Sequence, residues 1–231
     1  MGRATVVYFH EFDSVGRAQE DLPSGWEEAR KVTSILVDAA TPKDGYTAEH
    51  AVEVARLSRL VGMDLGLNEE ELEWLVQGAL LHDLGKLVGK LGVADAILEK
   101  PSTLTEEEWV VVKRHSEIGA QMIEPLESLS GAVLVVRHHH ERPDGSGYPD
   151  GLEGDEIPLA ARIVAAVDAY DVMLRGRPYW SERYRPKSSP AEVLKELWGE
   201  AGRQFDVRMV EAMGRVLGDP KTSSTDSPQP H

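Results

Sequence analysis

Histidines and carboxylates recur along this chain at intervals that suit a shared metal centre. Six of the eight histidines lie at residue 50 or between residues 82 and 140. The steps from His50 to His82, His115, His139 and Asp168 are 32, 33, 24 and 29 residues. Each step is about the length of a helix, a loop and the return, so successive helices of a bundle can each offer one ligand. Neutral imidazole and carboxylate suit Fe, Mn or Zn, and the absence of cysteine excludes thiolate sites.

The first cluster is His82-Asp83 in the sequence Leu-Leu-His-Asp-Leu-Gly-Lys. The imidazole can bind one metal while the carboxylate bridges two, at the roughly 3.5–4 Å separation of two-metal hydrolases. Lys86, one turn further on, would point a cation towards the same pocket. The alternative is a polar helix end, with Gly85 as its cap and a lysine favoured by the helix dipole. So short a motif leaves both interpretations open.

The second cluster is His138-His139-His140, followed by Glu-Arg-Pro-Asp-Gly-Ser-Gly-Tyr-Pro. Three adjacent imidazoles after the apolar run 133–136 pack poorly, because each buried ring nitrogen needs a partner. Metal coordination supplies such partners. The Asp-Gly-Ser-Gly-Tyr-Pro segment taken alone indicates only a tight turn.

Helical periodicity dominates the elements that must position these residues. Thr105 and Glu108 form the pattern of a capping box, and Gly66 and Asn68 interrupt the helix that begins near Tyr46. The predicted helices cover 26–40, 46 to the break at 66–68, 69–84, 105–123, 129–140, 159–174, 191–198 and 207–217. The Pro- and Gly-rich stretch 143–158 is the longest predicted loop, and such a loop is often functional. The sequence therefore predicts an all-α bundle.

The domain organisation predicted from these patterns has three parts. Residues 1–43 form a partly helical N-terminal extension, with a β-like run at 5–9; residues 44–218 form the main domain; residues 219–231 form a disordered tail. With no apolar run near 18 residues and no secretory signal, we expect a protein of the cytoplasm that does not enter a membrane.

The formal net charge of −15 restricts the partners. It argues against a nucleic-acid polymer, because such binders need clustered Lys and Arg. An anionic small substrate would need local positive charge, which bound divalent metals supply.

The ordered motifs resemble those of the HD-GYP domain, a subgroup of the HD phosphohydrolase superfamily. His82-Asp83-Leu84-Gly85-Lys86, then His115, then the run from His139 to Pro149 carry the resemblance. It continues through 157–163, 168–171 and 177–179, and covers about residues 44–217. The resemblance implies a multi-helix HD-domain bundle in bacterial second-messenger signalling. Such enzymes hydrolyse cyclic di-GMP to linear pGpG, and often on to GMP, with two or three Fe or Mn ions.

The resemblance also implies roles for particular residues. One metal would be held by His50, His82, Asp83 and Asp168, and the other by Asp83, His115, His139 and His140. Lys86 would stabilise phosphate oxygens or assist the leaving group, and Asp171 would orient a ligand or Lys86. Tyr148 and Arg177 match positions that contact the phosphates and the nucleotide, although each also suits a structural role. His138 would be an extra residue beside the ligands.

The chain also departs from the family pattern. Members with three metals carry a Glu where this chain has Tyr46, and Glu49 points to another helix face, so we predict two metals. Residues 87–90 are an apparent insertion, and Trp180 replaces a basic residue for which Arg175, Arg183 or Arg185 would have to substitute.

These departures leave the substrate open. The alternatives to cyclic di-GMP are another cyclic dinucleotide or phosphoester, or a non-catalytic domain that binds metal or nucleotide. A homodimer or a regulatory partner is a further prediction.

Overall fold

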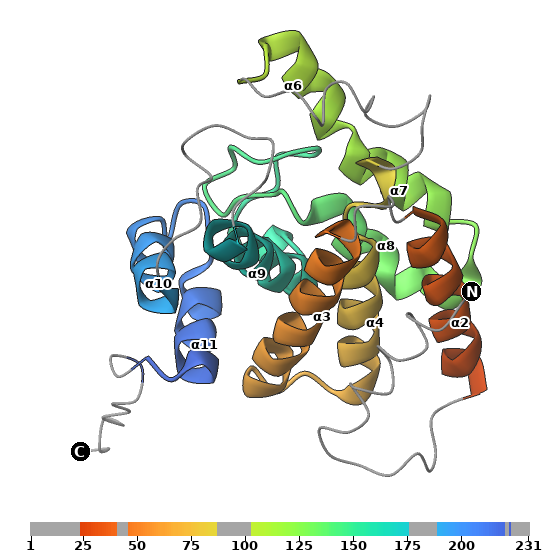
Figure 1. The fold of residues 1–231 in the computed structure, drawn as a ribbon, viewed down its shortest axis with the longest axis horizontal. Helices are drawn as coiled ribbons and strands as arrows, with labels where there is room; N and C mark the ends of the chain where they lie inside the picture. Colours follow the sequence, from red (N-terminus) through yellow and green to blue (C-terminus); the bar gives the residue numbers. More distant parts are fainter. Residues whose placement is uncertain (1–23, 41–45, 87–102, 176–188, 220–221, 223–231) are drawn as a thin grey trace.

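The computed structural model describes residues 24–40, 46–86, 103–175, 189–219 and 222, and most of them are helical (Figure 1). In chain order the elements are α2 (Ser24–Ala40), α3 (Tyr46–Asp64), α4 (Glu69–Leu81), η1 (Leu84–Lys86), α6 (Glu106–Lys113), α7 (His115–Ile123), η2 (Glu127–Leu129), α8 (Ser130–His138), η3 (Gly154–Glu156), α9 (Leu159–Arg175), α10 (Pro190–Gly199) and α11 (Val207–Leu217). The described residues contain no β-strand, only two isolated bridges. The predicted all-α fold is confirmed.

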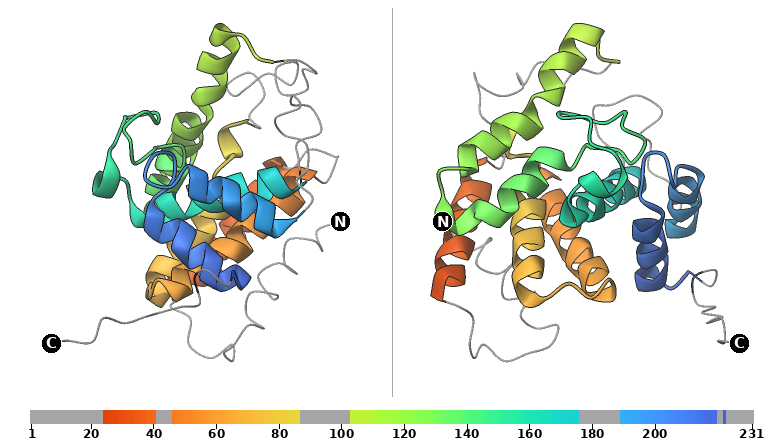
Figure 2. Two further views of the ribbon diagram at one scale, coloured as in Figure 1. Left: turned by 90° about the vertical axis from the view of Figure 1, so that its left-hand side faces the viewer. Right: turned by 180° about the vertical axis from the view of Figure 1, so that it is seen from behind.

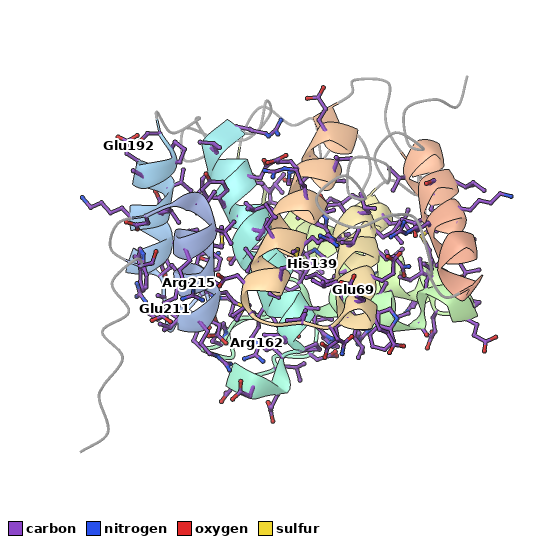
Figure 3. The ribbon with its side chains drawn as sticks, turned by 90° about the horizontal axis from the view of Figure 1, so that it is seen from below. Glu69, His139, Arg162, Glu192, Glu211 and Arg215 are labelled. Carbon is purple, nitrogen blue, oxygen red and sulfur yellow. The ribbon has the colours of Figure 1, made fainter. Side chains whose placement is uncertain are left out.

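The α4 and α9 helices form the centre of the bundle. Both are buried over most of their length, as their mainly apolar sequences require. Helix α4 packs against α3 and α8, and α9 packs against α3 and α10 (Figure 1). Figure 3 shows His139 in the middle of the bundle, whereas Glu192 and Glu211 lie towards its edge.

The outer helices cover this centre from several sides. Helices α10 and α11 pack against α9 on one side, and α2 packs against α4 on the other (Figure 2). An ion pair of 3.1 Å joins Arg30 on α2 to Glu73 on α4, and α2 adds Ala29 and Val37 to the core. Helix α2 falls within the predicted extension 1–43, whose boundary stays a prediction.

Three predicted helices near the histidines were wrong in their extent. The helix predicted over 69–84 ends at Leu81, and the helix predicted over 129–140 ends at His138. The helix predicted over 105–123 has the expected capping box at Thr105 but divides at Arg114, whose N–H donates to the carbonyl of Val111 in a tighter turn. Each break places a histidine or aspartate at a helix end.

A glycine allows the segment after α4 to approach α7 closely. A Cβ on Gly85 would lie 2.0 Å from the carbonyl oxygen of His115 and 2.8 Å from the nitrogen of Gly119. Real Cβ atoms essentially never come within 3.0 Å of such atoms, so only glycine fits here. The contact fixes η1, and with it Asp83 and Lys86, against the start of α7.

Several predictions lie outside the described residues: the run 5–9, the insertion 87–90, Arg177, Trp180, Arg183, Arg185 and most of the tail. Among the residues described, no helix is both long enough and apolar enough to span a bilayer.

Candidate metal centre

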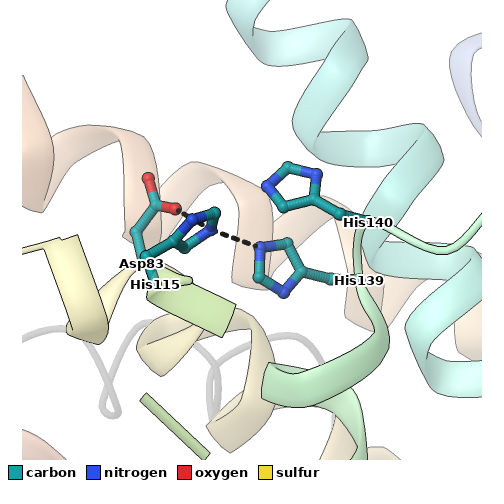
Figure 4. Close-up of side chains that lie close together, drawn as sticks. All are labelled: Asp83, His115, His139 and His140. Atoms are coloured by element: carbon teal, nitrogen blue, oxygen red, sulfur yellow. Dashed lines mark hydrogen bonds and ion pairs between the residues drawn. The ribbon is translucent and has the colours of Figure 1, made fainter. Parts of the chain in front are cut away.

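Helix ends bring five potential metal ligands to one place. His82 and Asp83 follow α4, His115 is the first residue of α7, and His139 and His140 follow α8. Figure 4 shows Asp83, His115, His139 and His140 converging from these segments. Because residues at a helix end are released from the helical repeat, adjacent side chains can turn into the same space.

Two further helices supply side chains from within their length. His50 lies in the second turn of α3, and Asp168 and Asp171 lie one turn apart on α9. His50 Nε2 is 3.1 Å from Asp168 Oδ1, and His50 Nδ1 is 2.7 Å from Asp171 Oδ2. His82 Nε2 lies 3.9 Å from the same Asp168 oxygen. All seven predicted metal ligands therefore lie together.

The potential ligands form two groups that share one carboxylate. Asp83, His115, His139 and His140 each place a ligand atom within 4.8 Å of the others. His50, His82 and Asp83 do the same. The shared Asp83 has two oxygens and stands between the groups, as a bridging carboxylate must.

Backbone carbonyls hold three of the imidazoles in one orientation. The Nδ1 atoms of His82, His115 and His139 lie 2.7, 2.6 and 2.8 Å from carbonyl oxygens three residues earlier in the chain. A carbonyl only accepts, so Nδ1 carries the proton and donates it, which leaves the lone pair on Nε2. Each of these lone pairs is thus available to a metal, in the arrangement usual for ligating histidines.

The Nε2 atoms face positions where a cation fits. His115 Nε2 and His139 Nε2 are 3.3 Å apart, so two lone pairs point towards one another. His82 Nε2 is fully buried and has no hydrogen-bond partner among the described residues. A divalent metal between such atoms would remove the repulsion and satisfy the buried acceptor. The donor set therefore fits metal ions, and these three histidines need no change of tautomer to bind them.

Burial keeps most of these imidazoles neutral. It lowers the pKa of His139 to about 3 and holds the pKa values of His115 and His140 well below their usual range. The pKa of His82 is also lowered, again mainly by burial. Neutral imidazole is the form that binds metal, so little proton release opposes binding at these four residues.

His50 differs because two carboxylates flank it. Burial alone would lower its pKa, but the nearby carboxylates of Asp168 and Asp171 outweigh burial and raise the pKa to about 9. Asp171 accepts from Nδ1, so loss of the Nε2 proton would free that atom for a metal while Nδ1 stays bonded to Asp171. Asp171 therefore holds the ring of a potential ligand in place, and orienting a ligand was one of the two roles predicted for it.

Comparison with known proteins identifies the family. A family model described as HD domain matches residues 31–209. The chain belongs to the HD domain family. The HD-GYP resemblance of the motifs is confirmed.

Two curated relatives of this HD domain chain are named as cyclic dinucleotide phosphodiesterases. It is 40% identical over 191 residues to the cyclic di-GMP phosphodiesterase response regulator RpfG of Xanthomonas campestris, covering 82% of this chain and 48% of that protein. It is also 40% identical over 144 residues to the 3'3'-cGAMP-specific phosphodiesterase 3 of Vibrio cholerae, covering 62% of this chain and 30% of that protein. The chain thus spans half or less of the length of these relatives.

A solved structure shares the fold. Bd1817, described as an HDG"Y"P protein from Bdellovibrio bacteriovorus, aligns with a TM-score of 0.61 at 18% identity, over 92% of this chain and 79% of that one. At this identity the likeness concerns the fold.

In this HD domain a buried glutamate organises the Gly-Tyr-Pro loop beside the histidines. Glu141 is 2% exposed, and its carboxylate accepts hydrogen bonds from the backbone N–H groups of Asp150, Gly151 and Leu152 at 2.7–3.1 Å. The bonds fold the loop back on the end of α8. Tyr148 is held there by its N–H, which donates to the His140 carbonyl.

The loop places Tyr148 at the edge of the metal-ligand cluster. Its ring is half-buried and lies 4.9 Å from the His140 ring and 6.5 Å from the His115 ring, centre to centre. Tyr148 is thus well placed for a substrate contact. Arg177, its predicted companion, lies outside the described residues.

His138, the first histidine of the triplet, bonds to groups outside the metal-ligand cluster. The ring nitrogens of His138 lie 3.1 Å from the Leu134 carbonyl and 2.9 Å from Asp150 Oδ2. Asp150 also accepts two hydrogen bonds from Arg137. His138 therefore ties the loop to α8 and is the extra histidine expected from the sequence.

Two cations lie close to the cluster. Lys86 is 7% exposed, and its Nζ is 2.5 Å from Asp83 Oδ1. Arg175 Nε donates a hydrogen bond to Asp171 Oδ1 at 2.8 Å. Arg175 was one of the arginines expected to substitute for the basic residue that Trp180 replaces, and its guanidinium is thus already bonded to a carboxylate. The exposed Glu49 lies 3.9 Å from Arg175, on the outer side of α3.

The sequence did not indicate the contacts of Glu141 and Lys113 near the cluster. Glu141 follows the histidines directly, yet nothing in its position shows that the loop's N–H groups turn towards it. Lys113 lies two residues before His115, and its place beside Tyr148 depends on the break at Arg114.

Proposed function

We propose that this chain is a metal-dependent phosphodiesterase that hydrolyses cyclic di-GMP to linear pGpG, with GMP as a further product to be sought. The observation that carries the proposal is the pair of buried ligand groups that share Asp83. The 40% identity to a curated cyclic di-GMP phosphodiesterase supports the same reaction class.

The proposed cofactors are two divalent ions, Fe or Mn. His50, His82, Asp83 and Asp168 would hold one ion, and Asp83, His115, His139 and His140 the other. When bound, such ions supply Lewis acidity that activates water and neutralises the phosphodiester in the transition state. The neutral imidazoles and the shared carboxylate support this assignment.

The chain's own groups would act around that site. The backbone carbonyls and Asp171 hold the imidazole tautomers, so little reorganisation accompanies the reaction. The Lys86 ammonium holds Asp83 and is near enough to the cluster to stabilise a phosphate oxygen or the leaving oxygen. Burial of the ligands excludes bulk water, which strengthens each of these interactions.

The substrate contact proposed for Tyr148 is supported by its position in the structure, whereas that proposed for Arg177 is supported by the sequence motif. The Tyr148 ring beside His140 supports a contact with the nucleotide. For Arg177, which belongs to the part of the chain left undescribed, the support remains the motif.

The test is turnover of cyclic di-GMP by protein loaded anaerobically with Fe²⁺ or with Mn²⁺. We expect pGpG from the wild type and none from the His82→Ala, Asp83→Ala double variant. His138→Ala is the matched control, because this neighbour of the ligands bonds to Leu134 and Asp150 instead. Activity in the double variant equal to wild type would overturn the proposal.

A second candidate substrate is 3'3'-cGAMP. The equal identity to a cGAMP-specific phosphodiesterase favours including it in the same assay. Turnover of cGAMP without turnover of cyclic di-GMP would reassign the substrate and keep the chemistry. Metal binding without cleavage of either would favour the non-catalytic alternative. The cytoplasmic location, and a homodimer or regulatory partner, stay predictions.

A further inference from the structure

An anionic substrate meets an unusual electrostatic problem in this protein. The formal net charge is −15, and two cations near the cluster are already paired with carboxylates. Lys86 pairs with Asp83, and Arg175 pairs with Asp171. A cyclic dinucleotide carries two phosphates, and a metal centre that cleaves one of them leaves the other to be neutralised elsewhere.

Lys113 is a cation at the edge of this centre that has no such pairing. It is the last residue of α6, it is exposed, and it makes no ion pair with a carboxylate of the residues that the structure describes. Its Nζ lies 5.4 Å from the centre of the Tyr148 ring, within the range of a cation–π contact. The ring holds the ammonium without neutralising its charge.

The position follows from the break between α6 and α7. His115 begins α7, and its Nδ1 bonds to the carbonyl of Val112, so the end of α6 is tied to the cluster. Tyr148 rests on His140, with 4.9 Å between ring centres. Since Lys113 Nζ is 5.4 Å from the same Tyr148 ring, it is no more than about 10 Å from the His140 ring.

We propose that Lys113 is a substrate-binding residue held in place by the Tyr148 ring. Its ammonium would contact the second phosphate of the cyclic dinucleotide, the one that is not cleaved. The inference rests on the proposed function, because it takes the ligand cluster as the place where the first phosphate binds. An ammonium is a compact, mobile donor that suits a phosphate oxygen.

A competing explanation is purely structural. A lysine in the last turn of a helix interacts favourably with the dipole, and Lys113 is so placed on α6. That role predicts a change in thermal stability alone. Substrate binding predicts a change in KM that depends on the second phosphate.

The experiment compares Lys113→Gln with Lys113→Arg and with Lys195→Gln in the metal-loaded protein. Lys195 is the matched control, because it is an exposed lysine on α10 that likewise makes no ion pair with the described residues. For cyclic di-GMP, we expect Lys113→Gln to raise KM roughly tenfold and to leave kcat within about twofold, as loss of one charge-assisted contact would. Lys113→Arg keeps the charge and should recover most of the affinity.

Bis(p-nitrophenyl) phosphate separates the two explanations, because it has a single phosphodiester and no second phosphate. Its kcat/KM should be the same in wild type and Lys113→Gln. If the wild type hydrolyses cyclic di-GMP and Lys113→Gln does so with an unchanged KM, the inference about Lys113 is wrong and the proposed function stands.

Calorimetric binding of cyclic di-GMP to the Mn²⁺-loaded protein distinguishes failure of the proposed function from failure of the Lys113 contact. If wild type binds without cleaving and Lys113→Gln binds about tenfold more weakly, the contact stands and the hydrolytic function fails. A wild-type protein that neither binds nor cleaves a cyclic dinucleotide would overturn both.

Discussion

Replacing Gly85 by alanine tests whether the fold itself sets the spacing of the metal ligands. The added Cβ would lie 2.0 Å from the His115 carbonyl oxygen, and the neighbour is backbone, which cannot rotate away. Reaching even 3.0 Å requires η1 and α7 to separate by about 1 Å. Overpacking of this kind costs up to about 3 kcal/mol, which for a chain of this size lowers Tm by roughly 6–12 °C.

The same movement would separate Asp83 on one side from His115 on the other. Metal–ligand distances tolerate changes of only about 0.2 Å, so we expect Mn²⁺ affinity to fall about 10- to 100-fold. Thermal denaturation of the apoprotein measures the first effect, and calorimetric Mn²⁺ titration measures the second.

Gly199→Ala is the matched control for this experiment. Gly199 ends α10, and a Cβ there would meet nothing within 4 Å. Alanine at that position should leave Mn²⁺ affinity unchanged and Tm equal or slightly raised. Wild-type Tm and Mn²⁺ affinity in Gly85→Ala would refute the close contact, whereas a lower Tm with unchanged affinity would refute its role in ligand spacing.

Three further predictions concern single hydrogen-bonding groups. Asp171→Asn removes the charge that fixes His50, so Mn²⁺ affinity in a calorimetric titration should fall about 10- to 100-fold with a smaller change in Tm. Glu141→Ala leaves three loop N–H groups without their acceptor and should cost about 3 kcal/mol in urea denaturation, whereas Glu141→Gln should cost less; equal losses would count against the described hydrogen bonds. The bond from Arg137 lowers the pKa of Asp150 to about 2, below its ordinary 3.8. Its carboxylate therefore adds stability above about pH 4 that is lost as pH falls through 2, and the unfolding free energies of wild type and Asp150→Asn should converge over that range.

Much of the fold was accessible from local patterns. Caps such as the Thr105–Glu108 box depend only on neighbouring residues, and the helical repeat shows which face is buried. The break at Arg114 was not accessible, because the amphipathic pattern continues through it and the contact of Gly85 with α7 is a tertiary one. Propensity indicates where a helix can run, and packing decides where it stops.

The same division applies to the metal centre. The spacing of the histidines alone indicated a common centre, because each interval is about the length of a helix, a loop and the returning helix. The sequence could not show that Asp171 is the hydrogen-bond partner of His50, because the two residues are 121 positions apart. It equally allowed Asp171 to face Lys86. Nor did the sequence show which histidine of the triplet turns to Asp150.

The arrangement separates the chemistry from the choice of substrate. The potential metal ligands are mostly buried, and five of the seven approach from helix ends. Under the proposed function they would meet only the phosphodiester that all cyclic dinucleotides share. The half-buried Tyr148 and the exposed Lys113 lie outside that cluster, where a base or a second phosphate would be. Substitutions at these two residues should therefore alter the preference between cyclic di-GMP and cGAMP while the rate with a single phosphodiester stays the same. Relatives of equal identity that differ in their named substrate are what such a division would produce.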